Sequence, residues 1–178
     1  MIASEHTLIR TADPDDADFL LEVYRTERPK AALLDAAREP VLPNRDELAE
    51  MLGATDAGRN QFFAVEDTAG RVRGFCGLRG VSIEAVFCEI MVLLIDPADH
   101  AGPVGRETVQ FLLDRAFGRM HLDKVLGTCL DSEPELHALL ADSGFVSGGV
   151  QRQVLYSGGA WHDMETLTRL RLVPGQGG

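Results

Sequence analysis

A strand, a turn containing glycine and proline, an amphipathic helix and a second strand follow one another in the middle of the chain. The apolar run Ile83–Ile95 ends at Asp96-Pro97, because proline cannot continue a hydrogen-bonded ladder. A turn at residues 102–105 then precedes a helical stripe of apolar side chains: Val109, Leu112, Leu113, Ala116 and Phe117. The strand Lys124–Leu130 comes next. Such a crossover joins parallel strands, so the unit predicts a parallel pair linked by a helix over Val104–Phe117.

The segments on either side of this unit predict antiparallel strands and further helices. Asp13-Pro14 is typical of a helix start, as are two capping-box pairs, Asn44 with Glu47 and Ser132 with Glu135. Further strands are expected at Thr7–Arg10, Gln61–Glu66, Val72–Leu78, Val150–Tyr156 and Trp161–Leu172. The expected order is β-α-α-β-β-β-α-β-α-β-β. It predicts an α/β (α+β) fold with one mixed, mostly antiparallel sheet and helices on both faces. We expect one domain over residues 1–173 and a disordered tail at 174–178.

The charge balance limits the partners that the chain can bind. The sequence has 17 Lys and Arg residues against 28 Asp and Glu residues, a formal net charge of −11. Such a surface repels phosphate backbones and anionic lipids, so we expect neither nucleic acid nor a membrane as a partner. A neutral or cationic amine is compatible with this charge.

The cysteines and the N-terminus indicate a cytoplasmic protein. Cys76, Cys88 and Cys129 lie in apolar segments without paired spacing, which is typical of reduced core thiols. No Cys/His cluster has the spacing of metal ligands, so no metal is expected. The N-terminus lacks the apolar run of a signal peptide.

Three stretches, taken in order, resemble the GNAT acyltransferases, and among them the ribosomal-protein-alanine acetyltransferase-like branch. The first is Glu89–Pro97, which resembles the family's central strand ending in Asp-Pro. The second, Gly102–Glu107, stands where the family has its pyrophosphate loop, usually written Arg/Gln-x-x-Gly-x-Gly/Ala. The third runs from Gly144-Phe145 to Leu170-Arg171 and resembles the closing hairpin. Their order and separation carry the resemblance, which covers nearly the whole chain.

The resemblance implies an N-acyltransferase that takes acetyl-CoA or another acyl-CoA as co-substrate. The acceptor would be a small-molecule amine or a peptide N-terminus, and a homodimer stays open. The two central parallel strands would splay, with backbone groups near Leu93 and Ile95 holding the pantetheine arm. The cofactor's pyrophosphate would lie at a helix start, where unpaired N–H groups and the helix dipole favour an anion. The residues expected there are Gly102, Val104, Gly105 and Arg106.

The sequence departs from the family pattern where the cofactor should bind. His100 stands at the Arg/Gln position, and Pro103, which has no N–H, replaces the first motif glycine. Glu133 and Leu136 stand where the family has an Asn and a Ser near the thioester, so the sequence identifies no acid for the leaving group. Two alternatives therefore stay open. One is a different acyl donor, either a carrier-protein thioester or an aminoacyl-tRNA, and the other is a binding module without catalysis.

Four residues are candidates for catalysis or substrate binding. Glu89, an acid on an apolar central strand, would take the proton of the amine, directly or through a water. Tyr156 would donate a proton or hydrogen-bond the substrate. His162 and Asp163 would bind the amine, although strand alternation lets only one of them face the site. Cys88 beside Glu89 has no base placed for it in the sequence and is interpreted as a core thiol.

Overall fold

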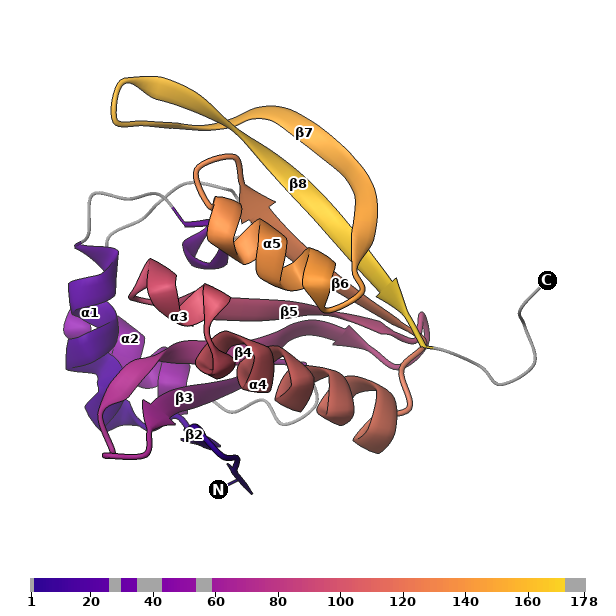
Figure 1. The fold of residues 1–178 in the computed structure, drawn as a ribbon. Helices are drawn as coiled ribbons and strands as arrows, with labels where there is room; N and C mark the ends of the chain where they lie inside the picture. The colour runs from indigo at the N-terminus through magenta and orange to yellow at the C-terminus, as the bar shows by residue number, and fades with distance from the viewer. Residues whose placement is uncertain (1, 26–29, 35–42, 54–58, 172–178) are drawn as a thin grey trace.

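One eight-stranded sheet forms the centre of the molecule, as the computed structural model shows for residues 2–25, 30–34, 43–53 and 59–171 (Figure 1). The strand order is β1-β2-β3-β4-β5-β6-β8-β7, and among these described strands only β5 and β6 are parallel neighbours. The strands are β1 (Ile2–Ala3), β2 (Thr7–Thr11), β3 (Gln61–Asp67), β4 (Val72–Ser82), β5 (Phe87–Leu94), β6 (Lys124–Leu130), β7 (Val146–Ser157) and β8 (Ala160–Leu170). The predicted mixed, mostly antiparallel sheet with a central parallel pair is confirmed.

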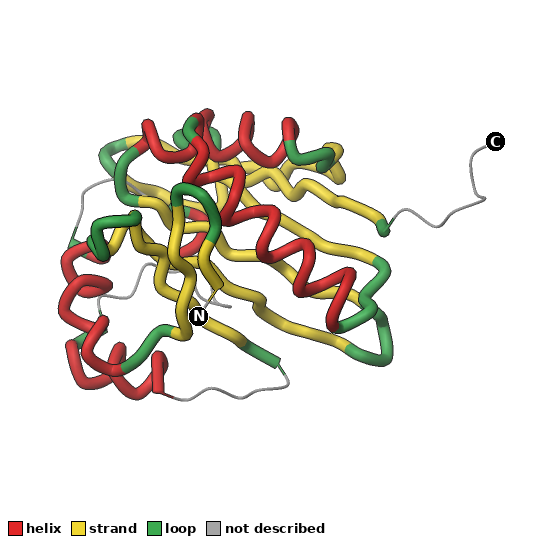
Figure 2. Tube along the Cα trace, turned by 60° about the horizontal axis from the view of Figure 1, so that its bottom comes forward, coloured by secondary structure: helices red, strands yellow, loops and turns green. Residues whose placement is uncertain are grey.

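Helices cover both faces of this sheet, and in Figure 2 they lie outside the strands. They are α1 (Ala17–Tyr24), α2 (Arg45–Gly53), α3 (Pro97–Ala101), α4 (Pro103–Leu113) and α5 (Pro134–Asp142). The described residues also form two short 3-10 segments, η1 (Pro14–Asp16) and η2 (Ala31–Leu33), and a π-helical segment, η3 (Asp114–Arg119). Helix α4 with η3 is the predicted crossover between β5 and β6.

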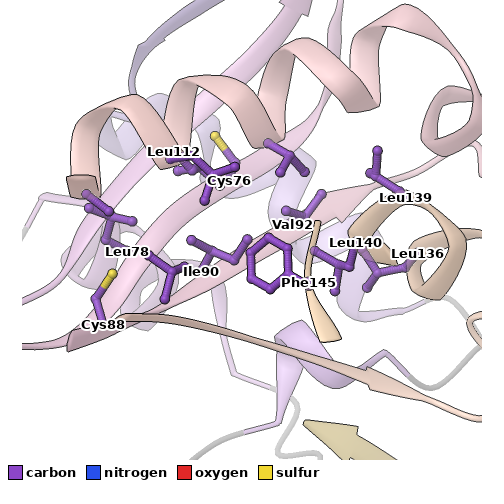
Figure 3. Close-up of a cluster of buried hydrophobic side chains, with 14 of the residues drawn as sticks. Cys76, Leu78, Cys88, Ile90, Val92, Leu112, Leu136, Leu139, Leu140 and Phe145 are labelled. Atoms are coloured by element: carbon purple, nitrogen blue, oxygen red, sulfur yellow. The ribbon is translucent and has the colours of Figure 1, made fainter. Parts of the chain in front are cut away.

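Side-chain alternation along β5 divides the core into two layers. Cys88, Ile90, Val92 and Leu94 face α4 and α5, where they join the larger apolar cluster. Figure 3 shows Ile90 and Val92 among side chains that include Leu112, Leu140 and Phe145. Met91 and Leu93 face the other way, into a cluster with Leu20 of α1 and Leu52 of α2. The strand thus presents one face to each helix layer.

Strands β5 and β6 separate along their length. Their pairing runs from Phe87 opposite Lys124 to Ile90 opposite Gly127 and goes no further among the described residues. Beyond that point β5 stays paired with β4 as far as Leu94, and β6 stays paired with β8 as far as Leu130. The two strands therefore diverge, and each has an unpaired backbone edge toward the gap.

Several local predictions hold and others are wrong. Asp13 caps η1, and the capping box of Asn44 with Glu47 is present with both bonds at 2.9 Å. The strand predicted over Ile83–Ile95 begins only at Phe87, because residues 83–86 form the turn after β4. The capping box of Ser132 with Glu135 is also wrong, since Glu133 is the N-cap of α5.

The remaining expectations concern the cysteines, the membrane and the tail. All three cysteines are free and buried, and burial raises the pKa of Cys88 and of Cys129 to about 12. Among the described residues, no helix has both the length and the apolar character needed to span a bilayer. The predicted tail at 174–178 lies outside the described residues.

Candidate active site

The backbone polar groups that face the gap between β5 and β6 follow from the register of β5 with β4. The Ile95 N–H donates to the Arg73 carbonyl at 3.1 Å, so the polar groups of Ile95 point toward β4. Direction alternates along a strand, and the register shows no bulge between Glu89 and Leu94. The groups of Leu93 therefore also point toward β4, and those of Val92 and Leu94 face the gap. The backbone groups of Leu93 and Ile95, predicted to hold the pantetheine arm, therefore face β4 and not the gap.

Glu89 lies on the face of β5 that it shares with Met91 and Leu93, as strand alternation predicts. Its Oε1 atom accepts a hydrogen bond from Arg79 Nη2 at 2.9 Å and another from Thr128 Oγ1 at 2.7 Å. Arg79 is the register partner of Glu89 on β4, and Thr128 is the first β6 residue beyond the paired segment. Glu89 therefore connects three strands at the point where the gap begins.

The 3-10 segment η2 packs against β5 and β6 and is held there from two sides. Arg79 Nη1 donates to the carbonyl oxygens of Ala32 and Leu34 at 3.3 and 3.5 Å. Glu133 Oε2 accepts from the Ala31 N–H at 3.0 Å and from the Leu130 N–H at 2.9 Å. Burial raises the pKa of Glu133, against the effect of these two hydrogen bonds.

An apolar cavity of about 170 Å³ lies over β5 on this face. Its walls come from α1, η2, α2 and the strands β3, β4 and β5. Met91 and Leu93, on the unpaired part of β5, contribute to it, and Arg79 is the charged member of the described lining. The cavity therefore lies next to Glu89 and the start of the gap.

The start of α4 offers unpaired backbone donors on the other face. Gly102 is the N-cap, so the N–H groups of Gly102, Val104 and Gly105 have no partner within the helix. Gly102 donates to the Asp99 carbonyl at 3.3 Å, and Pro103 has no N–H. Of the predicted donors, the backbone groups of Val104 and Gly105 remain, whereas the Arg106 N–H is in place to bond the Gly102 carbonyl.

Gly105 is buried against α3, which limits what can replace it. A Cβ at this position would lie 2.7 Å from the His100 carbonyl oxygen and 2.8 Å from that of Asp99. Both atoms belong to the backbone of α3. The glycine thus permits close contact between α3 and α4. This packing role is additional to the role in cofactor binding that the sequence predicts for Gly105.

A second cavity, of about 330 Å³, lies between the start of α4 and α5. His100 and Arg106 line one side of it, and Glu135 and Asp142 of α5 line the other. His100 is 8% exposed, and its Nδ1 atom has no hydrogen-bond partner among the described residues. Burial lowers the pKa of the His100 imidazole, and Lys30 lowers it further. The Arg106 guanidinium and the backbone donors at the start of α4 fit the diphosphate of an acyl-CoA, beside the His100 ring that lines the cavity.

The other predicted site residues lie on the β7–β8 hairpin and have partners of their own. Tyr156 is 59% exposed and packs against Trp161, with ring centroids 5.4 Å apart. His162 Nδ1 lies 2.8 Å from Asp131 Oδ1, and Asp163 pairs with Arg152 at 2.6 Å. None of the three lines the cavity over β5, so the structure does not bring them together with Glu89.

Two residues of this site escape sequence reasoning. Arg79 falls one residue beyond the strand that the sequence predicts, because that strand was expected to end at Leu78. Had the hairpin been aligned with Arg79 opposite Glu89, the pairing of opposite charges would have indicated Arg79 as a site residue. Thr128 is a polar residue among the mostly apolar residues of β6, which is a weaker signal.

Comparison with known proteins gives one family and a set of similar folds. The family described as an acetyltransferase (GNAT) domain matches residues 9–166. A structure of spermidine N-acetyltransferase from Vibrio cholerae in complex with CoA and spermine is 20% identical, with a TM-score of 0.77, over 94% of this chain and 96% of that chain. A dodecameric structure of that enzyme in an intermediate state is 20% identical, with a TM-score of 0.75, over 94% and 95%. At these identities the likeness concerns the fold. A comparison with curated proteins gives no match.

Proposed function

The chain belongs to the acetyltransferase (GNAT) family and is an acetyl-CoA-dependent N-acyltransferase, and we propose that its acceptor is a small-molecule amine that enters through the cavity over β5. The separation of β5 from β6 carries this proposal, because the gap lies between that cavity and the anion site at α4. Of the two acceptor classes that the sequence leaves open, a cavity of about 170 Å³ favours the small molecule over a peptide N-terminus. Membership in the ribosomal-protein-alanine acetyltransferase-like branch stays a prediction.

The chain's own residues divide into a binding set and a reacting set. Val104, Gly105 and the Arg106 side chain hold the diphosphate, and the gap-facing backbone groups of Val92 and Leu94 hold the pantetheine arm. When bound, acetyl-CoA would supply a thioester carbonyl for the amine to attack, and its carbon–sulfur bond would break as CoA leaves and its sulfur takes up a proton from solvent. Glu89 accepts the proton that the amine releases as the carbon–nitrogen bond forms.

Acetyl-CoA is expected to raise the Tm of the protein. A ligand at about 100 times its Kd stabilises the folded state by about 2.7 kcal/mol, which corresponds to roughly 5–10 °C for a domain of this size. Differential scanning fluorimetry measures the shift. Arg106→Ala is expected to reduce it, and Arg25→Ala, a control on the exposed end of α1, should leave it unchanged. An unchanged Tm with every short acyl-CoA contradicts the proposal and favours a carrier-protein donor or a binding module.

Binding of CoA is expected to take up a proton at His100. Burial and Lys30 lower the pKa of the free imidazole, so it is neutral at neutral pH. A bound diphosphate stabilises the imidazolium and raises that pKa in the complex, so affinity for CoA should increase as pH falls from about 8 to about 6. The other charged groups around the cavity are Arg106, Glu135 and Asp142.

Calorimetric titration in buffers of different ionisation enthalpy counts the protons taken up. His100→Gln keeps a hydrogen-bonding group at this position, but glutamine does not titrate in this pH range. Any protons that CoA itself takes up are counted equally for the wild type and for this variant. The pH dependence should therefore be smaller in His100→Gln. Equal proton uptake by both proteins would assign the titration to another group.

A further inference from the structure

We infer that the cavity over β5 selects an amine whose body is one aromatic ring or one short branched aliphatic group, and that it rejects polyamines. The inference rests on the proposed function, since it names the acceptor class of the same site. It is drawn from the lining, the size and the charge of the cavity, together with the contacts that fix η2 above it.

Every element that contributes to the cavity supplies apolar side chains to its lining. Six of the side chains are Leu20, Met51, Phe62, Phe75, Met91 and Leu93. Phe75 is 1% and Leu93 is 2% exposed, so these walls belong to the packed core and do not rearrange without cost. An apolar cavity of about 150 Å³ holds a benzene ring, and this one has about 170 Å³. Its volume therefore matches a single ring or a branched chain of similar bulk.

The charges beside the cavity disfavour a second ammonium group on the acceptor. Arg79 is the charged side chain of the described lining, and it already forms an ion pair with Glu89 at 2.9 Å. A polyamine would place a further cation in apolar surroundings beside this guanidinium, without a carboxylate from the described lining to balance it. A monoamine needs only Glu89, which contacts Arg79 of the lining and Thr128 where the gap begins.

The roof of the cavity is fixed in place without a ligand. Segment η2 supplies Ala32, Leu33 and Leu34 to the lining. Its backbone is bonded to Arg79 on β4 and to Glu133 at the start of α5. A cavity held from two sides selects by shape, because an oversized body cannot enter unless these hydrogen bonds break.

The test compares phenethylamine with spermidine as acceptors of acetyl-CoA, by kcat/KM from thiol release and by direct binding in calorimetry. We expect phenethylamine to have a kcat/KM at least about tenfold higher, as a pocket fitted to an apolar body gives. Ala32→Leu adds bulk inside the cavity and should weaken phenethylamine binding by about tenfold or more. Its Tm shift with acetyl-CoA should stay at the wild-type value, because the α4 site lies on the other face, and this shows that the variant is folded.

Each result has a distinct meaning. A higher kcat/KM for spermidine overturns the inference, and so does phenethylamine binding that is unaffected by Ala32→Leu. If phenethylamine binds in an Ala32-dependent manner while no amine is acetylated, the proposed function fails and the apolar specificity of the cavity stands. Ala32-dependent binding together with preferred acetylation of phenethylamine supports both.

Discussion

Replacing Glu89 by glutamine is expected to lower kcat by about 10²-fold or more and to leave the affinity for acetyl-CoA nearly unchanged. Glutamine keeps a side-chain oxygen that accepts hydrogen bonds from Arg79 and Thr128, but it does not take a proton from the amine. The groups proposed to hold CoA are backbone groups and residues of α4, which the substitution leaves in place. Steady-state thiol release gives kcat, and calorimetry gives the affinity.

Because Glu89 forms an ion pair with Arg79, its replacement could also lower activity by disturbing the structure. The pH dependence of the activity distinguishes this structural effect from the loss of a base. If Glu89 takes the proton, the activity of Glu89→Gln should rise toward that of wild type at high pH, where the amine arrives deprotonated. Thr128→Val removes a hydrogen bond to the same oxygen but keeps the carboxylate, so its kcat should fall by less than about tenfold. A Glu89→Gln enzyme as fast as wild type at every pH would show that another group is the base.

Gly105→Ala is expected to destabilise the protein and to weaken CoA binding together. The added Cβ would lie 2.7 and 2.8 Å from two backbone oxygens of α3, so α3 and α4 have to move apart. Overpacking of this kind costs about 1–3 kcal/mol of unfolding free energy. The movement also displaces the N–H groups of Val104 and Gly105, and loss of a hydrogen bond to a charged group lowers affinity by about 10-fold or more. Thermal unfolding and calorimetry measure the two effects.

Gly118→Ala is the matched control for this substitution. Gly118 lies in η3, where a Cβ would have no heavy atom within 4 Å. The control should keep the Tm within about 2 °C of wild type and bind CoA normally. If Gly105→Ala behaves like Gly118→Ala in both measurements, the contact between α3 and α4 does not position the cofactor.

The fold was predictable because its decisive pattern is local. The stripe from Val109 to Phe117 and the strand Lys124–Leu130 fix the crossover, and the crossover fixes the parallel pair. The turn at residues 83–86 was missed because it contains no glycine, proline or asparagine. Val86 adopts a left-handed conformation in this turn, with φ of 54°, and packs against the core. Tertiary contacts therefore stabilise a turn for which the local sequence contains no turn-forming residue.

The site was less predictable, since it depends on pairings between distant residues. Sequence alternation places Glu89 on the same face as Met91 and Leu93, but it does not show which neighbouring strand each backbone group faces. That direction follows from the bond between the Ile95 N–H and the Arg73 carbonyl, which shows that the backbone groups of Val92 and Leu94 face the gap and those of Leu93 and Ile95 do not. The role of Arg79 likewise follows from register across a hairpin.

The divergence of β5 and β6 lowers the stability of the free protein and prepares the gap between the two strands for a ligand. Four residue pairs join the two strands, and from Met91 to Leu94 one edge of β5 has no strand partner in the part of the chain that the structure describes. If β5 and β6 were paired along their whole length, the ligand-free protein would be more stable. A ligand could then enter between the strands only after the hydrogen bonds between them had broken. Here that work is done once, during folding, by the packing that holds β5 against β4 and β6 against β8. Substitutions that raise the Tm of the enzyme should therefore leave the gap between β5 and β6 unchanged and stabilise other parts of the structure.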